Sequence, residues 1–186
     1  MGVDKSLLNY HGIEQRYHVY EMLEQFCSRV FLSYSSESQI PPNTTRALIC
    51  DSPAYAGHGP ISGLLSAFSR FPSKGFLLIG CDYPFLQAGD MGVFLSSIPD
   101  DSVAAAFYNE QENCYEPVLA WYSPAAGTLL SKHFYDGNKS LQDFLKKINA
   151  FKVIPADPAS LQSVDTYAEY SAVTEQLLMK CKLHNP

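Results

Sequence analysis

The chain has 186 residues, of which 46% are hydrophobic, and a formal net charge of −6. This length is enough to bury a core, and so large an apolar share excludes a disordered polypeptide. The negative charge disfavours a broad nucleic-acid surface, which would need many Lys and Arg side chains. An anionic small molecule stays possible as a substrate, because a divalent cation and one lysine can reverse the local field.

Cysteine usage and hydropathy limit the compartment and the partners. The five cysteines form no CxxC pair and are odd in number, which disfavours a zinc site or a disulfide framework. They fit a reducing compartment, and no apolar run is long enough for a membrane span. We therefore expect a cytoplasmic protein that acts as a monomer and binds neither nucleic acid nor a membrane.

Helix-like and strand-like patterns alternate in the first half of the chain. Val19, Met22 and Leu23 recur on one face of a helix, and Pro60 suits the first position of another. The strands are continuous apolar runs, which is typical of parallel strands that are covered on both faces. The predicted helices are 14–28, 61–70 and 87–97, and the predicted strands are 30–34, 47–50 and 76–81.

The second half begins with two longer strands on either side of a polar turn, which predicts a hairpin. Ser140 suits the cap of a later helix. The predicted strands are 103–108, 115–122 and 151–154, and the predicted helices are 125–134, 141–148 and 167–181. Because strands alternate with helices, we expect one three-layer α/β/α domain over residues 1–186, with a mostly parallel sheet.

Two aspartates, Asp51 and Asp82, each come directly after an apolar strand. In an open α/β sheet ligands bind beyond the carboxyl ends of the strands, so both side chains should lie at the same edge. Two carboxylates there could form a site for Mg²⁺, which prefers one or two carboxylates plus phosphate oxygens. The alternative is that each Asp only ends its strand in a turn, and the prolines at 53 and 84 favour that interpretation.

Two further segments could contact an anion. Gly59 and Gly63 lie at the entrance of a predicted helix, where glycine lets the backbone approach a ligand and the first amides can bind a phosphate. Lys5 could neutralise a triphosphate. An ordinary glycine-rich helix start and a solvated terminal lysine explain the same residues equally well.

Taken in order, these segments resemble the motifs of the molybdenum-cofactor nucleotidyltransferases. The matching segments are MGVDKSLL at 1–8, GPISGLLS at 59–66, CDYPFL at 81–86, EPVLA at 116–120, and VDT at 164–166 followed by Glu169. The resemblance covers nearly the whole chain and is specific for the superfamily, and less so for the substrate. It implies a Rossmann-like fold of the nucleotide-diphosphate-sugar transferase type.

The resemblance also implies a role for each matching residue. Lys5 would contact the nucleotide phosphates, and Asp51 would hold the guanine nucleotide. Asp82 would hold Mg²⁺ and, through it, the phosphates. Ser33 falls where the family often has an asparagine, whose two-sided amide a single hydroxyl cannot copy. The implied nucleotide-binding residues are Lys5, Ser33, Asp51, Gly59, Gly63 and Asp82.

The implied reaction transfers GMP from GTP to molybdopterin and releases pyrophosphate. The terminal phosphate of molybdopterin would attack the α-phosphate of GTP in line, so the reaction needs positioning and charge neutralisation more than a general base. Lys5 and Asp82 would be the catalytic residues. The alternatives are a related enzyme that uses CTP or a sugar-phosphate acceptor, and a non-catalytic module that binds a nucleotide or a partner.

The sequence departs from the family pattern at several points. Glu116 stands where many relatives have histidine, which puts pterin recognition in doubt. Ser163 and Asp165 replace asparagines and Tyr167 replaces a proline. The leucine-alanine-glycine-glycine start of the family's loop and the strand before it are not in the sequence. We therefore expect the chain to be a poor catalyst with a marginally stable fold. An upstream extension of roughly 15 residues should restore both activity and stability.

Overall fold

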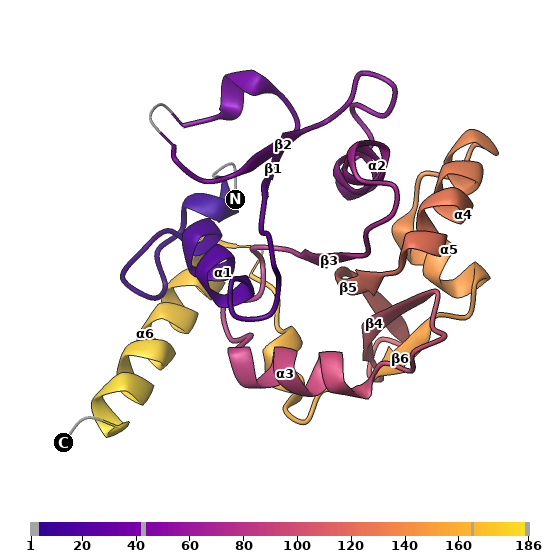
Figure 1. The fold of residues 1–186 in the computed structure, drawn as a ribbon. Helices are drawn as coiled ribbons and strands as arrows, with labels where there is room; N and C mark the ends of the chain where they lie inside the picture. The colour runs from indigo at the N-terminus through magenta and orange to yellow at the C-terminus, as the bar shows by residue number, and fades with distance from the viewer. Residues whose placement is uncertain (1–3, 42–43, 165, 185–186) are drawn as a thin grey trace.

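The structure is a computed structural model that describes residues 4–41, 44–164 and 166–184. Its helices are α1 (Gln15–Leu23), α2 (Pro60–Arg70), α3 (Ala88–Ser97), α4 (Pro124–Tyr135), α5 (Leu141–Lys147) and α6 (Tyr167–His184). Its strands are β1 (Leu32–Tyr34), β2 (Leu48–Cys50), β3 (Phe76–Ile79), β4 (Ala104–Asn109), β5 (Cys114–Tyr122) and β6 (Phe151–Val153). Helices and strands follow one another in the predicted order (Figure 1).

The strands form a two-stranded sheet and a four-stranded sheet. β1 and β2 pair in parallel. The larger sheet has the order β3-β5-β4-β6, in which β6 runs parallel to β4 and β5 runs antiparallel to both of its neighbours. The α/β class and the hairpin of β4 and β5 are confirmed. The expectation of a parallel partner for β3 is wrong within the larger sheet, because the returning strand of the hairpin takes that place.

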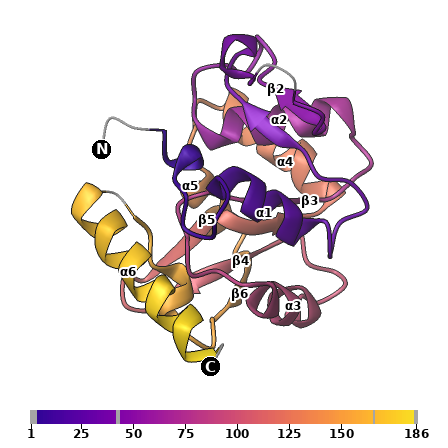
Figure 2. The ribbon, with the colours of Figure 1, turned by 90° about the vertical axis from the view of Figure 1, so that its left-hand side faces the viewer.

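Helices cover both faces of the larger sheet, which gives the three predicted layers (Figures 1 and 2). The alternation along β4 shows this most clearly. Ala104 and Ala106 pack in a core with residues of α2, α4 and α5, whereas Ala105 and Phe107 pack in a second core with residues of α1 and α3. All four side chains are almost completely buried. A strand that is covered on both faces has no polar alternation, as its sequence predicts.

Local hydrogen bonds fix where the helices begin and end. The Ser140 hydroxyl accepts from the amide of Asp143 at 3.1 Å, which confirms the predicted cap of α5. The first helix is shorter than predicted. The amides of Phe26 and Cys27 both donate to the carbonyl of Leu23, at 3.0 and 2.9 Å, so the chain tightens into a turn after Leu23.

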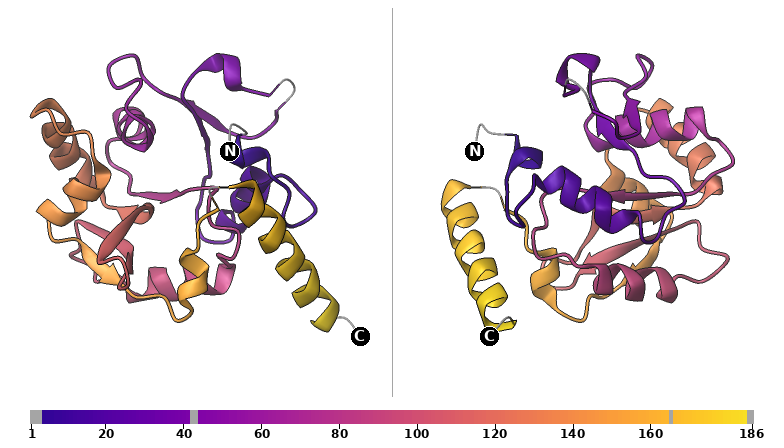
Figure 3. Two further views of the ribbon diagram at one scale, coloured as in Figure 1. Left: turned by 180° about the vertical axis from the view of Figure 1, so that it is seen from behind. Right: turned by 60° about the vertical axis from the view of Figure 1, so that its left-hand side comes forward.

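The last helix returns to the start of the chain (Figure 3). Val173 and Leu177 of α6 share a small core with Tyr10 and with Phe85 of the loop after β3. Residues from both ends of the sequence therefore meet beside that loop. Among the described helices, none is both long enough and apolar enough to cross a membrane.

Candidate active site

The loop after β3 meets the start of the chain at an ion pair. The Asp4 carboxylate accepts from the amide of Ser6 at 3.0 Å and begins the short 3-10 helix Lys5–Leu7. Lys5 Nζ then lies 3.6 Å from Asp82 Oδ2, with the two side chains 27% and 41% exposed. The structure thus brings together the two residues that were predicted to be catalytic, and it leaves them open to solvent.

A second group forms where β1 and β2 end against α2. The amide of Asp51 donates to the carbonyl of Tyr34 at 3.0 Å, which fixes the end of β2 beside the end of β1. Gly63 faces both strand ends. A Cβ on Gly63 would lie 2.6 Å from Ser33 Oγ and 3.6 Å from Asp51 Oδ1. Ser33, Asp51 and Gly63 are therefore neighbours, and burial raises the pKa of the Asp51 carboxyl above its ordinary value.

Replacing Gly63 by Ala is expected to disturb this group without unfolding the chain. The added methyl group would force the Ser33 hydroxyl aside, because 2.6 Å is too short for a carbon–oxygen contact. We expect the KM for the nucleotide to rise about tenfold while kcat changes less. Gly89→Ala on α3 is the matched control, since open space surrounds Gly89. An unchanged KM in Gly63→Ala would remove this group from the nucleotide site.

The loop that leads into α2 has the backbone that its glycines permit. Gly57 and Gly59 have φ angles of +84° and +70°, values that favour glycine. Gly59 is the N-cap of α2, and Pro60 follows it as the first residue of the helix, as predicted. The start of α2, an end of a helix that favours anions, therefore lies one turn from Gly63.

Two buried serines hold this loop, and the sequence interpretation missed them. Ser62 donates its hydroxyl to the carbonyl of Tyr55 at 2.5 Å and accepts from the amide of His58 at 3.0 Å. Ser66 accepts from the amide of Ser52 at 2.7 Å. The available signal was two serines four positions apart within an otherwise apolar helix face, where a hydroxyl needs a partner.

The ends of β1 and β3 converge on the same buried cation. Arg16 is only 9% exposed and donates to Glu14 at 2.8 Å. Arg16 lines one cavity together with Tyr34, the last residue of β1, and Cys81, which follows β3. The two strands thus bring their carboxyl ends toward one region, as a shared ligand edge requires. That Asp51 and Asp82 face one cleft stays a prediction.

A stacked histidine pair attaches α1 to the loop after Asp82. The rings of His11 and His18 are 3.8 Å apart, and His11 Nε2 lies 3.0 Å from the carbonyl oxygen of Pro84. Burial, and then the charge of His11, lower the pKa of His18 to about 4. Burial also lowers the pKa of His11. Both rings are therefore neutral at pH 7.

This pair predicts a loss of stability in mild acid. The pKa of His18 is about 4 in the folded chain and near its ordinary value when unfolded, so between these values the unfolded chain binds more protons. The free energy of unfolding should fall as the pH drops from about 6.5 to about 4. Chemical denaturation at several pH values measures this slope. His18→Gln should flatten it, and an unchanged slope in that variant would exclude the pair as its cause.

A polar cavity of about 680 Å³ is lined by Tyr83 and by residues of the turn between β4 and β5. The Tyr83 hydroxyl donates to Glu116 at 2.8 Å, and burial raises the pKa of the Glu116 carboxyl against the lowering effect of that hydrogen bond. Ser163 lines the same cavity, so two of the departures from the family pattern meet there. Asp165, another departure, lies outside the described residues.

Asp82 is the predicted metal ligand, and its surroundings fit a magnesium ion that a nucleotide brings with it. Among the described residues no cluster of three or more His, Cys, Asp or Glu side chains could hold a metal ion. A dedicated protein cage is therefore not formed by this part of the chain. Mg²⁺ does not need one, because one carboxylate and several phosphate oxygens suffice.

The fold, the ion pair of Lys5 with Asp82 after β3, and the separate group of Asp51 and Gly63 at the end of β2 fit an α/β domain of the nucleotidyltransferase class. Comparison with known families places the chain within it. Residues 1–152 match the MobA-like NTP transferase domain, and the chain belongs to that family.

Individual relatives agree with this assignment. The chain is 30% identical over 133 residues to the molybdenum cofactor biosynthesis bifunctional protein of Synechocystis, matching 71% of this chain and 38% of that protein. It is 21% identical over 178 residues to a probable molybdenum cofactor guanylyltransferase of Synechococcus elongatus, covering 93% and 91% of the two chains. The chain thus spans well under half of the first relative's length.

A solved structure confirms the fold. Molybdopterin-guanine dinucleotide biosynthesis protein A from Archaeoglobus fulgidus superposes with a TM-score of 0.77, covering 96% of this chain and 92% of its own at 17% identity. At that identity the likeness supports the arrangement of helices and strands alone. The predicted Rossmann-like fold of the nucleotidyltransferases is confirmed.

Proposed function

We propose that this chain carries the nucleotidyl-transfer site of a molybdenum cofactor guanylyltransferase, which moves GMP from GTP to molybdopterin. The observation that carries the proposal is the contact of Lys5 with Asp82 at the carboxyl end of β3, in a chain of the MobA-like family. The proposed substrates, GTP and molybdopterin, are suggested by the names of the relatives given above. The ion pair supplies one group for the phosphates and one for the cation that accompanies them.

The proposed chemistry needs little from the protein besides placement. An oxygen of the molybdopterin phosphate forms a bond to the α-phosphorus of GTP, and the bond from that phosphorus to the bridging oxygen of pyrophosphate breaks. Asp82 would hold Mg²⁺, which supplies Lewis-acid stabilisation of the phosphate charge when bound. Lys5 offsets charge on the triphosphate, and the positive end of the α2 dipole adds to that effect.

The polar cavity beyond Tyr83 is the proposed place for the acceptor. Its lining begins at Tyr83, the residue after Asp82, so a molecule held there can direct its phosphate toward Lys5, which pairs with Asp82. Its wall carries Glu110, Glu112 and Glu116, which accept hydrogen bonds. Such a wall suits the N–H groups of a pterin ring, while the phosphate points away from the carboxylates and toward Lys5.

A comparison of nucleotides tests the proposal and its nearest alternative. A chain completed with an amino-terminal strand and glycine-rich loop, here called the completed chain, is supplied with molybdopterin, Mg²⁺ and one nucleoside triphosphate at a time. We expect pyrophosphate release with GTP at least about tenfold faster than with CTP, ATP or UTP, the discrimination expected from one base-specific contact. Faster release with CTP would support the cytidylyl alternative. Pyrophosphate release with a sugar phosphate in place of molybdopterin would support the alternative with a sugar-phosphate acceptor.

The non-catalytic alternative rests on the altered closing motif, at Ser163, Asp165 and Tyr167, and on the start of the family's loop, which the sequence does not contain. It predicts that the completed chain binds GTP with Mg²⁺ and yet releases no pyrophosphate with any acceptor. Equilibrium binding of GTP, measured beside turnover, separates that outcome from a chain that binds no nucleotide at all.

A further inference from the structure

The last helix contacts the segment that carries Lys5. This segment, residues 4–11, is here called the arm. The Tyr170 hydroxyl on α6 donates to the carbonyl oxygen of Asn9 at 3.3 Å, across 161 positions of sequence. The rings of Tyr10 and Tyr170 are 5.1 Å apart and meet edge to face. One side chain of α6 therefore holds the arm through a hydrogen bond and an aromatic contact.

Apolar packing joins the same two elements. Tyr10 is 7% exposed and shares a core with Val173 and Leu177 of α6. Leu8 of the arm packs against that core. The 3-10 helix Lys5–Leu7 has only three residues and buries none of them, so it has little stability of its own. The order of the arm therefore depends on what its neighbouring residues contact.

Two further contacts hold the arm on either side of the contact with α6. The amide of Gln15 donates to the carbonyl of Leu8 at 2.7 Å. His11 Nε2 lies 3.0 Å from the carbonyl oxygen of Pro84. Asn9, which α6 holds, lies between these two points. Loss of the contact with α6 should therefore loosen the arm without unfolding the chain.

The residues that lead into α6 hold the other member of the ion pair. The amide of Val164 donates to the carbonyl oxygen of Asp82 at 3.1 Å. The start of α6 is then fixed by a reciprocal pair of hydrogen bonds. The amide of Thr166 donates to Glu169 Oε2 at 2.9 Å, and the amide of Glu169 donates to Thr166 Oγ1 at 3.2 Å. One stretch of chain thus reaches Asp82 through Val164 and the arm through Tyr170.

The ring that α6 holds lies close to the ion pair. Burial, then Tyr170 and then the charge of Asp82 raise the pKa of Tyr10 to about 12. The Lys5 and Asp82 side chains are 27% and 41% exposed, and an exposed pair has little energy with which to order a lysine side chain. The position of Lys5 must therefore be set by the arm and by the residues that hold the arm.

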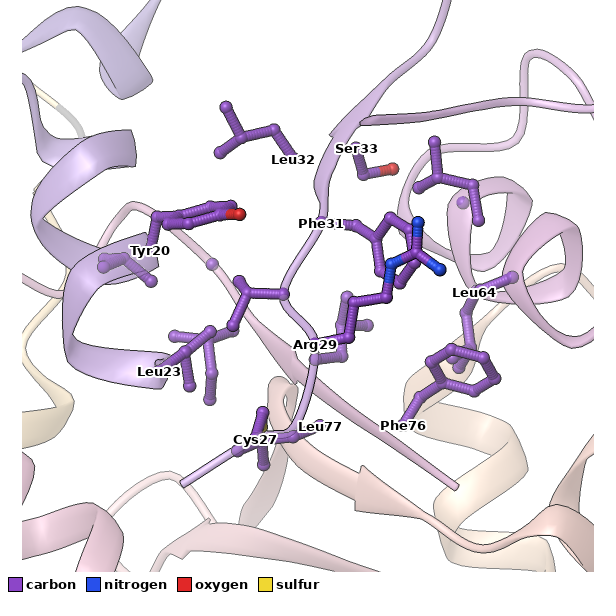
Figure 4. A pocket seen from close by; sticks show the side chains of 18 of the residues that line it. Tyr20, Leu23, Cys27, Arg29, Phe31, Leu32, Ser33, Leu64, Phe76 and Leu77 are labelled. Atoms are coloured by element: carbon purple, nitrogen blue, oxygen red, sulfur yellow. The ribbon is translucent and has the colours of Figure 1, made fainter. Parts of the chain in front are cut away.

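The arm lies between α6 and the cavity at the ends of β1 and β3. Ser6 of the arm lines this cavity of about 690 Å³ together with Ser33 and Gly63. Figure 4 shows Tyr20 and Leu23 of α1 at one wall of the same cavity. Among the described residues of α6, none lines it. The helix therefore meets this side of the site through the arm and not directly.

We propose that Tyr170 is a positioning residue for Lys5. It holds the arm at Asn9 and Tyr10 and so fixes the point from which Lys5 reaches a phosphate. The role of Lys5 rests on the proposed function, whereas its placement rests on the contacts of α6 alone. An arm that is ordered before the nucleotide arrives spares the nucleotide the entropy cost of ordering it. Tyr170 acts through the arm and needs no contact with a substrate.

Amide hydrogen exchange tests the proposal on the 186-residue chain without any substrate. The amides of Leu7 and Leu8 donate to the carbonyls of Asp4 and Lys5 at 3.1 and 3.2 Å, so their exchange reports opening of the arm. In Tyr170→Ala we expect both amides to exchange at least about tenfold faster. This is the size expected when a hydrogen bond and an aromatic contact are lost together.

Tyr167→Ala is the matched control, because Tyr167 is on the same helix and is 70% exposed. Equal exchange of Leu7 and Leu8 in the two variants would overturn the proposal. So would an equal rise at the amides of β4, which would indicate general destabilisation. Tyr170→Phe keeps the ring against Tyr10 and loses only the hydroxyl, so exchange should rise about threefold. Should Tyr170→Ala fail to fold, unchanged exchange in Tyr170→Phe would overturn the proposal instead.

A double-mutant cycle in turnover separates the placement of Lys5 from other effects of the helix. In the completed chain Tyr170→Ala should lower kcat at least about tenfold, because a misplaced group stabilises the transition state less. Once Lys5 is replaced by Ala, the same change at Tyr170 should have almost no further effect. Fully additive losses would contradict an action through Lys5. Absence of turnover in the unaltered completed chain would refute the proposed function, while exchange in the arm would still decide the role of Tyr170.

Discussion

Replacing Asp82 by Asn is expected to lower turnover of the completed chain by at least about a hundredfold, the usual cost of losing a key electrostatic group at a reacting phosphate. The change removes a carboxylate that contacts Lys5 and that is proposed to hold Mg²⁺. Stability should change little, because the pair is 27% and 41% exposed and exposed pairs contribute about 0–1 kcal/mol. Pyrophosphate release and thermal melting measure the two effects separately.

Asp101→Asn is the matched control for this variant. Asp101 is exposed in the turn before β4 and lies outside the site, so the same loss of one carboxylate charge should leave turnover unchanged. Mg²⁺-dependent turnover near the normal rate in Asp82→Asn would refute the assignment of Asp82 as the metal ligand. A large fall in melting temperature would instead indicate a structural role.

The second large effect is expected from the completed chain itself. A strand placed between β1 and β3 would pair with Ser33, Leu77 and Ile79 and would cover the half-buried face of β3. Four or more backbone hydrogen bonds at about 1 kcal/mol each amount to about 4 kcal/mol. For a chain of this size that raises the melting temperature by about 10 °C. The loop should also raise turnover, because phosphate binding uses amides held in a fixed concave arrangement.

Differential scanning calorimetry of the two forms, with and without GTP and Mg²⁺, checks this prediction. Equal melting temperatures, raised equally by GTP with Mg²⁺, would contradict the expectation that an added strand pairs with β1 and β3. They would favour the non-catalytic module.

Much of the fold could be predicted because its local signals are strong. The apolar runs of β4 and β5 are long and are separated by a polar turn, so the hairpin follows from the sequence. Ser140 and Pro60 mark helix starts through hydrogen bonding and backbone geometry that depend on a few neighbouring residues. The partner of β3 could not be predicted in this way, because pairing depends on which distant strand occupies the adjacent position.

The candidate site was predictable in part for a similar reason. Lys5 and Asp82 could be named from motifs, and the structure brings them into contact. Arg16 was missed because nothing in a helical pattern shows that a surface-type side chain is buried between two strand ends. Ser62 and Ser66 were missed because a serine's importance depends on the loop that it holds. These are long-range facts that no local pattern contains.

Product analysis tests the central claim most directly. The completed chain is mixed with GTP, molybdopterin and Mg²⁺. The products are identified by mass spectrometry, and the released pyrophosphate is quantified. We predict one molybdopterin–GMP adduct for each pyrophosphate released, and no release when molybdopterin is left out. Pyrophosphate release that is indifferent to molybdopterin, or GTP that binds and stays intact, would contradict nucleotidyl transfer at the site of Lys5 and Asp82.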